Sequence, residues 1–394
     1  MTTPAPSQSA TPRVVHTDQP HLLIADDQAD VLEALRLLLK THGFVVRTVS
    51  SPAAVLAALR QADHVYDLLL MDLNYARDTT SGDEGLELVA QVRALDPHLP
   101  VVVMTAWSTV TLAVATMREG AGDFVQKPWD NARLLDTVRA QVAAGRRRRR
   151  AQRLEADARD VQQRLLAGPL PRVPGFDLAV VSRVAEGLGG DFHHLAPLAA
   201  GRLGVAIADV CGKGTPAALL MASVKASLED LVVADLPPRE VCARLARTIA
   251  PRLAPDRFVS MTYAVLDPAR GTLVYANAGH PAPFLQRADG TVRRMQRGGP
   301  VLGVVAEADY EEGVLALGRG DRLVLVTDGI TEAGRDGASE LGDERLLAGL
   351  RELRPLAAAE AAARVLELAR TFGGDRLGDD ATVVVADVEA APPR

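Results

Sequence analysis

The stretch Ile207 to Ala222, IADVCGKGTPAALLMA, contains a strand end, a tight turn and a helix start. Its apolar run stops at Asp209, two glycines flank Lys213 in the turn, and Pro216 stands in the first turn of the expected helix. An unpaired carboxylate at the end of an apolar strand is unfavourable to bury. We therefore expect a cation, a metal ion or a water-filled cleft beside Asp209.

Three further aspartates stand in similar settings. Asp191 follows GLGG, Asp328 follows the apolar run RLVLVT, and Asp379 comes shortly before the run ATVVVADV. Few basic residues lie close to them in sequence, and carboxylate oxygens are the ligands that hard divalent cations prefer. Together with Asp209, these residues predict a metal site built from oxygen ligands.

Five motifs in this order resemble the SpoIIE/RsbU branch of the PPM-type, metal-dependent serine/threonine phosphatases. They are GLGGDF, IADVCGKGTPAALLMA, YANAGHPAPFL, VTDGITEA and DDATVVV, and the resemblance covers roughly residues 173 to 388. It implies a four-layer αββα sandwich, whereas periodicity alone predicts only an α+β fold. His194 is a departure, because the family commonly has a second acidic residue there.

The resemblance also implies a role for each carboxylate. Asp209 would bridge two divalent ions, Mn²⁺ or Mg²⁺, and the carbonyl of Val210 would help to hold one of them. Asp191 would serve one ion largely through water, while Asp328 and Asp379 would hold the other. Two such ions lower the pKa of a shared water, which can then attack phosphorus without a covalent enzyme intermediate.

Four neighbouring residues have less defined roles. Lys213 either contacts the substrate phosphate or lies on the surface. Asn277 and His280 either contact substrate or form a hydrogen-bonded turn in NAGHP. Asp380 is expected either to assist Asp379 or to face solvent.

The N-terminal half alternates short apolar runs with amphipathic segments. The runs are LLIA, FVVRTV, DLLLM, PVVVM and DFVQ, and helices are expected near 29–40, 52–62, 84–95, 109–119 and 131–143. Continuous apolar strands separated by helices predict an α/β domain with a five-stranded, doubly wound parallel sheet. In such sheets the chemistry lies at the carboxyl ends of the strands.

Polar residues follow these strands. Asp26 and Asp27 come after the first, Asp72 after the third, Thr105 after the fourth and Lys127 after the fifth. This pattern resembles a response-regulator receiver domain over about residues 21 to 144. Three carboxylates in one place repel one another unless a Mg²⁺ lies among them. With its charge offset by the metal, an incoming phosphoryl group could be attacked by Asp72.

By the same resemblance, the carbonyl of Asn74 would complete the magnesium shell. Lys127 would pair with the acyl phosphate, and Thr105 would hydrogen-bond to it. Phe124 stands at the position of the aromatic switch residue. The segment 74–85 is longer than the usual loop after the phosphoacceptor.

Residues 145 to 172 are expected to form a helical linker. Its run Arg146 to Arg150 is either a nucleic-acid patch or a solvated hinge, and the net charge of −6 favours the hinge. Spacings of four, three and four then place apolar residues on one helix face, as in a coiled-coil seam. These residues are Leu154, Ala158, Val161 and Leu165. The seam predicts a parallel homodimer, and docking on the following domain is the alternative.

The bulk composition is that of a globular protein. The chain has 394 residues, of which 48% are hydrophobic and 24% charged, and no apolar run approaches a membrane span. Two cysteines are too few for a disulfide framework, so we expect a cytoplasmic protein. The expected organisation is a disordered tail (1–20), receiver (21–144), linker (145–172), phosphatase domain (173–388) and a second tail (389–394).

These observations predict a two-component response regulator. A sensor histidine kinase would phosphorylate Asp72, and this would control dephosphorylation of phosphoserine or phosphothreonine on a partner, typically an anti-sigma factor antagonist of the STAS type. The sign of this control is open. A non-catalytic adaptor that keeps the phosphatase fold as a binding surface is the alternative. A cyclic-dinucleotide synthase does not fit, because Phe192 follows Asp191 where that signature requires Glu.

Overall fold

The computed structural model describes residues 19–61, 65–75, 83–106, 116–166, 168–185, 187–335, 339–374 and 377–389. The chain divides into two compact units, Met1–Leu154 and Glu155–Arg394. Nearly all of both expected tails, most of the segment 74–85 and most of the expected helix 109–119 lie outside the described residues. Within the described part of the chain, no helix has the length and apolar character needed to span a membrane.

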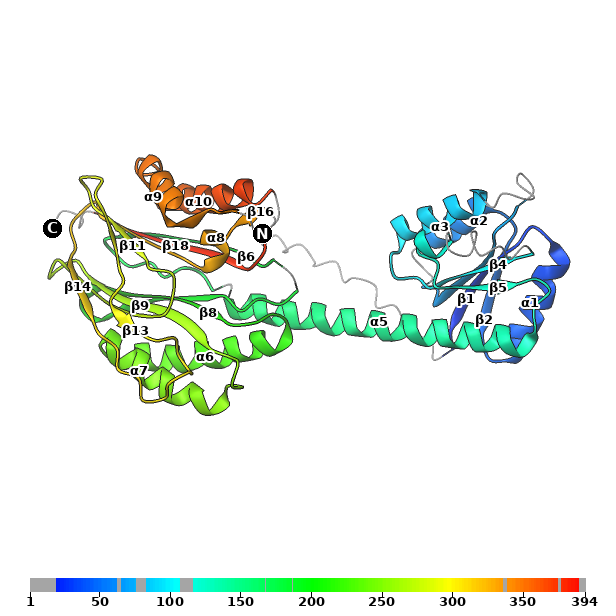
Figure 1. Cartoon of the computed structure of the whole chain (residues 1–394), viewed down its shortest axis with the longest axis horizontal. Coiled ribbons are helices and arrows are strands. Elements are labelled where there is room, and N and C mark those ends of the chain that lie inside the picture. The colour runs from blue at the N-terminus through cyan, green and yellow to red at the C-terminus, as the bar shows by residue number, and fades with distance from the viewer. Residues whose placement is uncertain are drawn as a thin grey trace, which may run out of the picture. The chain divides into compact units, whose positions relative to one another are not determined.

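The first unit is a five-stranded parallel sheet in the order β2-β1-β3-β4-β5. The strands are β1 (His21–Ala25), β2 (Val45–Val49), β3 (Leu68–Asp72), β4 (Val101–Thr105) and β5 (Asp123–Gln126). The helices between them are α1 (Ala29–Thr41), α2 (Pro52–Arg60) and α3 (Asp83–Leu95), and α5 (Asn131–Leu166) follows (Figure 1). The predicted doubly wound sheet is confirmed.

Apolar side chains cover both faces of this sheet. Leu35 of α1 and Val138 of α5 pack on one face, and Val55 of α2 and Val92 of α3 pack on the other. Every residue of β3 and β4 is buried, which explains why these strands read as continuous apolar runs. The polar residues after the strands are therefore left at one edge of the sheet.

The arginine run continues helix α5 without a break (Figure 1), and the expectation that the whole run is solvated was wrong for two of its side chains. Residues three positions apart lie on the same helix face. On that face the Arg146 Nε atom lies 2.9 Å from an Asp67 carboxylate oxygen. One turn further along, Arg149 lies 2.9 Å from Asp96 and also donates to the Tyr66 carbonyl. Two arginines of the run thus fasten the helix to the receiver.

The described part of the second unit contains two large antiparallel-rich sheets, five α-helices and a short pair of strands. One sheet has the order β13-β10-β9-β8-β7, with β14 also paired to β10, and the other has the order β12-β11-β15-β18-β6. The strands are β6 (Phe176–Arg183), β7 (Phe192–Leu198), β8 (Arg202–Val210), β9 (Val259–Asp267), β10 (Thr272–Ala278), β11 (Phe284–Gln286), β12 (Val292–Arg294), β13 (Gly298–Gly299), β14 (Gly313–Ala316), β15 (Arg322–Val326) and β18 (Ala381–Val388). The helices are α6 (Thr215–Val233), α7 (Pro238–Ile249), α8 (Asp328–Thr331), α9 (Gly342–Glu352) and α10 (Ala358–Phe372), and β16 (Gly334–Arg335) pairs with β17 (Ser339–Glu340).

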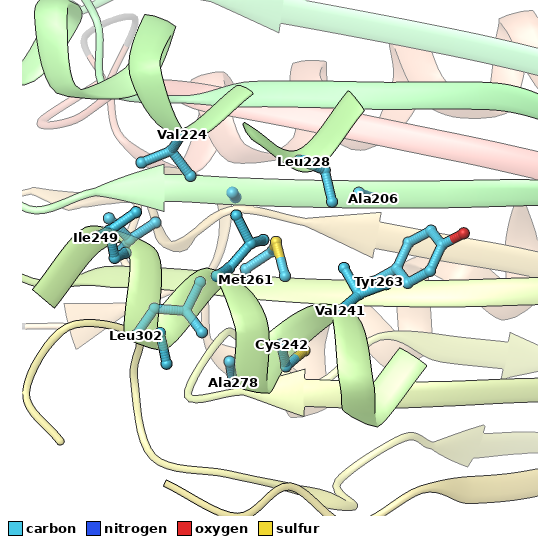
Figure 2. Close-up of a cluster of buried hydrophobic side chains, with 14 of the residues drawn as sticks. Ala206, Val224, Leu228, Val241, Cys242, Ile249, Met261, Tyr263, Ala278 and Leu302 are labelled. Carbon is cyan, nitrogen blue, oxygen red and sulfur yellow. The ribbon is translucent and has the colours of Figure 1, made fainter. Parts of the chain in front are cut away.

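These elements form four layers. Helices α6 and α7 pack on the β7–β10 sheet through apolar residues that include Leu228, Ile249 and Met261 (Figure 2). A second core, with Ile207 and Leu325, lies between the two sheets, and a third lies beneath α9 and α10 (Figure 1). The αββα sandwich is therefore present. The short strands β11 to β13 go beyond the prediction, because two or three residues are too few for a periodic signal.

Candidate functional site

Three aspartates meet at the carboxyl edge of the receiver sheet. One oxygen from each of Asp26, Asp27 and Asp72 lies within 4.8 Å of the other two. Asp26 is fully buried and Asp72 is 5% exposed, whereas Asp27 is exposed. The donor set is all oxygen and opens to solvent on one side, which fits a Mg²⁺ that retains water ligands.

Lys127 reaches this cluster from the end of β5. Its Nζ lies 2.7 Å from Asp26 Oδ2 and 3.0 Å from Asp72 Oδ2. Burial raises the pKa of Asp72, and the ammonium of Lys127 opposes that rise. The backbone N–H of Lys127 donates to the carbonyl of Thr105, which brings the ends of β4 and β5 together at this edge.

Two other residues predicted to act in the receiver have known positions, but the structure does not test their roles. Asn74 is partly buried, and its Oδ1 has no hydrogen-bond partner among the described residues. Phe124 is 38% exposed on β5. Their roles as metal-shell residue and aromatic switch stay predictions.

Strand pairing brings the four predicted aspartates of the second unit together in two pairs. Asp209 ends the apolar part of β8, and Asp191 immediately precedes β7, which pairs with β8 through Phe192 and Ala208. In the other sheet, β15 runs antiparallel to β18. Asp328 follows the end of β15, and Asp379 precedes the start of β18. Each sheet therefore contributes two carboxylates.

Asp191 is held by side chains of the opposite sheet. Its Oδ2 accepts hydrogen bonds from the hydroxyl groups of Thr327 at 2.7 Å and Thr382 at 2.8 Å. Its Oδ1 is buried and has no partner in the described part of the chain. Burial and the neighbouring charge of Asp209 raise the pKa of Asp191 well above its ordinary value. A buried carboxylate oxygen without a donor is a ready ligand for a cation.

Asp209 is the electrostatic centre of the cluster. Burial, followed by the charges of Asp328 and Asp379, raises the pKa of Asp209 to about 7. Burial and Asp379 also raise the pKa of Asp328. Carboxylates that shift one another in this way repel, and a divalent cation among them removes that repulsion.

The residues present fit a pair of divalent ions. A Cβ atom at Gly190 would lie 2.5 Å from the Val210 carbonyl oxygen and 3.1 Å from Asp209 Oδ1, so the glycine leaves these oxygens accessible. Among the described residues of this unit, no three carboxylate, histidine or cysteine ligand atoms cluster as tightly as in the receiver. The fit to ions depends instead on the buried, unpartnered Oδ1 of Asp191 and on the raised pKa of Asp209.

Asp380 lies beneath this site, so the solvent-facing alternative was wrong. It is 8% exposed, and its carboxylate accepts from the backbone N–H groups of Ala185 at 2.9 Å and Gly190 at 2.8 Å. The supporting residues Thr327 and Thr382 were missed at the sequence level. Their one available signal is their position, since each stands one or two residues from an aspartate of the motifs VTDG and DDAT.

A cavity of about 650 Å³ opens onto Asp209, Asp328 and Asp379. Lys213 is close to it, with its Nζ 3.4 Å from Asp379 Oδ1, and its side chain is 53% exposed. A lysine at this position can meet an anionic substrate, but its ion pair with Asp379 also accounts for it. Both alternatives for Lys213 therefore stay open.

Asn277 and His280 both line this cavity and also build a turn. The Asn277 amide donates to the His280 carbonyl at 2.9 Å and accepts from the His280 N–H at 2.7 Å. The His280 Nδ1 lies 2.7 Å from Ser260 Oγ, and burial lowers the pKa of His280 to about 3. A neutral imidazole in this turn shapes the cavity wall and cannot act as a general acid near neutral pH.

Comparisons with known proteins agree with this architecture. Residues 22–139 match the family model for the response regulator receiver domain, and residues 199–389 match the one for stage II sporulation protein E (SpoIIE). The phosphoserine phosphatase RsbU of Bacillus subtilis (strain 168) is 34% identical over 176 residues, which are 44% of this chain and 52% of RsbU. The chain thus spans about half the length of this relative.

Two solved structures resemble the second unit. The RsbU and RsbW domains of Rv1364c from Mycobacterium tuberculosis align with a TM-score of 0.51 and 25% identity, over 57% of this chain and 63% of that one. The SiaA PP2C domain of Pseudomonas aeruginosa aligns with a TM-score of 0.52 over 61% of this chain and 97% of that one, and its 19% identity supports the fold alone.

The fold and these matches define a class of protein, a receiver joined by a long helix to a PPM-type phosphatase fold. Residues 22–139 are therefore a response regulator receiver domain, and residues 199–389 are a SpoIIE-type PPM phosphatase domain. The SpoIIE match begins at residue 199, after Asp191. The assignment of Asp191 therefore depends on the strand pairing and on its own hydrogen bonds.

The raised pKa of Asp209 predicts that Mn²⁺ binding strengthens as pH rises. An exposed Asp has an ordinary pKa of 3.8, whereas Asp209 titrates at about 7 in the folded, metal-free chain. Between these values the folded state binds more protons than the unfolded state, so metal-free stability falls as pH rises through this window. A bound cation replaces the proton. Calorimetry in buffers of different protonation enthalpy should show proton release below pH about 7, and pH-independent affinity would contradict the shift.

Proposed function

We propose that the second unit removes phosphate from phosphoserine or phosphothreonine on a partner protein and that the receiver controls this activity. The observation that carries the proposal is the meeting of Asp209, Asp328 and Asp379, drawn from two sheets, at one substrate-sized cavity. Asp191 lies close enough to Asp209 for the charge of Asp209 to raise its pKa. The similarity to the phosphoserine phosphatase RsbU supports the same reaction.

The chain's own residues would prepare the site for hydrolysis. Two Mn²⁺ or Mg²⁺ ions, held by these four aspartates and the Val210 carbonyl, would supply a hydroxide at neutral pH and offset phosphoryl charge. Thr327 and Thr382 fix the direction of Asp191, and Gly190 keeps the Val210 carbonyl accessible. With water as the nucleophile, the reaction would require no cysteine or serine nucleophile from the chain.

The receiver would supply the input. Asp72 is the expected phosphoacceptor for a sensor histidine kinase, with Mg²⁺ at Asp26 and Asp27 and with Lys127 as the partner of the acyl phosphate. Helix α5 begins in the receiver unit and ends in the phosphatase unit, so it is the element through which a change at Asp72 would act.

We expect two partners, a phosphoprotein substrate and a second copy of the chain. An anti-sigma factor antagonist of the STAS type is the proposed phosphoprotein, as the resemblance to the SpoIIE/RsbU branch implies, and the similarity to the phosphoserine phosphatase RsbU supports a phosphoserine substrate. A second copy of the chain is the proposed partner of the helix seam. Its apolar residues Leu154, Val161 and Leu165 are 61%, 57% and 49% exposed, as an unpaired coiled-coil face would be.

The adaptor alternative is disfavoured by electrostatics. Burial and neighbouring carboxylates raise the pKa values of Asp191, Asp209 and Asp328, so this cluster destabilises the fold unless a cation binds among its members. A binding surface without catalysis has no need for that arrangement.

Phosphate release from the intact protein distinguishes a phosphatase from a non-catalytic adaptor. With Mn²⁺ present, p-nitrophenyl phosphate and a phosphoserine form of a STAS-type antagonist should both lose phosphate, and EDTA should stop both reactions. Capture of the phosphorylated antagonist without phosphate release would favour the adaptor. Hydrolysis of the small ester alone would keep the enzyme and reject the proposed substrate.

A further inference from the structure

The C-terminal part of helix α5 holds the glycine loop that leads to Asp191. Gln162 of α5 is 5% exposed, although its helix neighbours Val161 and Gln163 are exposed. Its Nε2 donates to the carbonyl of Gly189 at 2.6 Å, and its Oε1 accepts from the N–H of Gly189 at 3.1 Å. Both ends of the amide side chain thus bind the backbone of one residue of the loop, Gly189.

Further contacts tie the same loop to the metal-binding residues. One turn earlier in α5, Arg159 donates to the Gly187 carbonyl at 2.9 Å. On the other side, Gly190 donates to Asp380 at 2.8 Å. The loop is therefore fixed between the helix and the start of β18, and the next residue is Asp191.

We propose that Gln162 is a positioning residue that fixes the Gly189 backbone and thereby sets the metal affinity of the Asp191 side of the site. This inference rests on the proposed function and adds helix α5 as the element that controls the phosphatase site. The backbone position of Asp191 must be right for Oδ2 to meet Thr327 and Thr382 and for Oδ1 to stay free for a cation. Gly190 shares this constraint, because a Cβ atom added there would lie 2.5 Å from the Val210 carbonyl oxygen.

Gln162 also connects helix α5 to the loop that carries the proposed metal ligand Asp191. Arg146 and Arg149 fasten the earlier part of α5 to the receiver, and Gln162 fastens its later part to the loop. A rotation or shift of the helix by a fraction of a turn would break the paired hydrogen bonds before it displaced any ligand directly. Metal affinity, rather than substrate binding, is therefore the quantity that the helix controls.

The test compares Gln162→Met with Gln163→Met in the full chain. Methionine preserves the length of the side chain but removes both hydrogen bonds, and the adjacent exposed glutamine is a matched control on the same helix. Mn²⁺ binding is measured by electron paramagnetic resonance of the free ion, and the receiver site of the same molecule serves as an internal reference.

We expect Gln162→Met to weaken Mn²⁺ binding at the phosphatase site by about 10- to 100-fold, which is the usual effect of losing a group that orients a metal ligand. The receiver affinity and the KM for p-nitrophenyl phosphate at saturating Mn²⁺ should not change. Gln163→Met should leave all three quantities unchanged. Equal Mn²⁺ affinities in the two variants, or a loss of thermal stability without a loss of affinity, would overturn the inference.

Two further variants keep the result interpretable. If Gln162→Met does not fold, Gln162→Asn retains an amide that is one methylene too short to bind both groups of Gly189, and it should shift the affinity in the same direction. Asp209→Asn tests the metal site itself, independently of the positioning role of Gln162. Loss of Mn²⁺ in Asp209→Asn but not in the Gln162 variants rejects the positioning role alone, whereas retention in Asp209→Asn rejects the proposed metal site itself.

Discussion

Replacing Asp209 by Asn is expected to lower Mn²⁺-dependent phosphate release by about 1,000-fold or more, because the proposed bridging ligand would be lost. The change is nearly isosteric, so the core around β8 should survive. It also removes one of several mutually repelling carboxylates, since burial together with the charges of Asp328 and Asp379 raises the pKa of Asp209 to about 7. The metal-free variant should therefore be as stable as the parent chain, or more stable.

This pairing of lost activity with retained stability distinguishes a metal ligand from a structural residue. Hydrolysis of p-nitrophenyl phosphate and thermal unfolding by circular dichroism are the two measurements. Asp256→Asn is the matched control, since Asp256 is exposed in the same unit, and it should change neither quantity. Unchanged hydrolysis in Asp209→Asn would reject the catalytic assignment.

Replacing Asp72 by Asn is expected to abolish phosphoryl transfer to the receiver. The nucleophilic oxygen is lost, while the amide can still occupy the buried position at the end of β3. Incorporation of labelled phosphate from acetyl phosphate should fall to background. Any change in phosphatase activity caused by beryllofluoride should disappear as well.

The control for this prediction is Asp136→Asn, which changes an exposed carboxylate on α5. It should incorporate phosphate normally. Labelling of Asp72→Asn at the parent level would place the phosphoacceptor elsewhere in the chain.

Much of the fold and many of the proposed ligands could be predicted from local sequence. Asp26, Asp72, Asp209 and Asp328 each follow an apolar run, and a run that ends in a carboxylate predicts both a strand and a polar site at its end. The parallel sheet follows from the same runs, whereas the two-sheet sandwich was implied only by the resemblance to the phosphatase family. Strand ends are local features, so the chain carries their signal directly.

The supporting contacts could not be predicted in this way. Thr327 and Thr382 meet Asp191 across a sequence separation of 136 and 191 residues. The hydrogen bonds of Gln162 with Gly189 join a charged helix to a glycine loop, and no periodic pattern marks either partner. Such pairs depend on how the two sheets and the helix pack, which periodicity does not encode.

The contacts of the arginine run could not be predicted from local sequence either. A row of five arginines points to every side of a helix, and the net charge of the chain favoured solvent for all of them. Packing against the receiver instead selects Arg146 and Arg149, because Asp67 and Asp96 lie on the facing surface. The partners were visible in the sequence, but their position beside the helix was not.

Counting bound Mn²⁺ in the full chain tests the central claim most directly. The parent protein should bind three ions, one at Asp26, Asp27 and Asp72 and two in the phosphatase unit, and the latter pair should show magnetic coupling in the electron paramagnetic resonance spectrum. Asp209→Asn should bind one uncoupled ion. A parent chain that binds one ion, or an Asp209→Asn chain that keeps the coupled pair, would contradict the account.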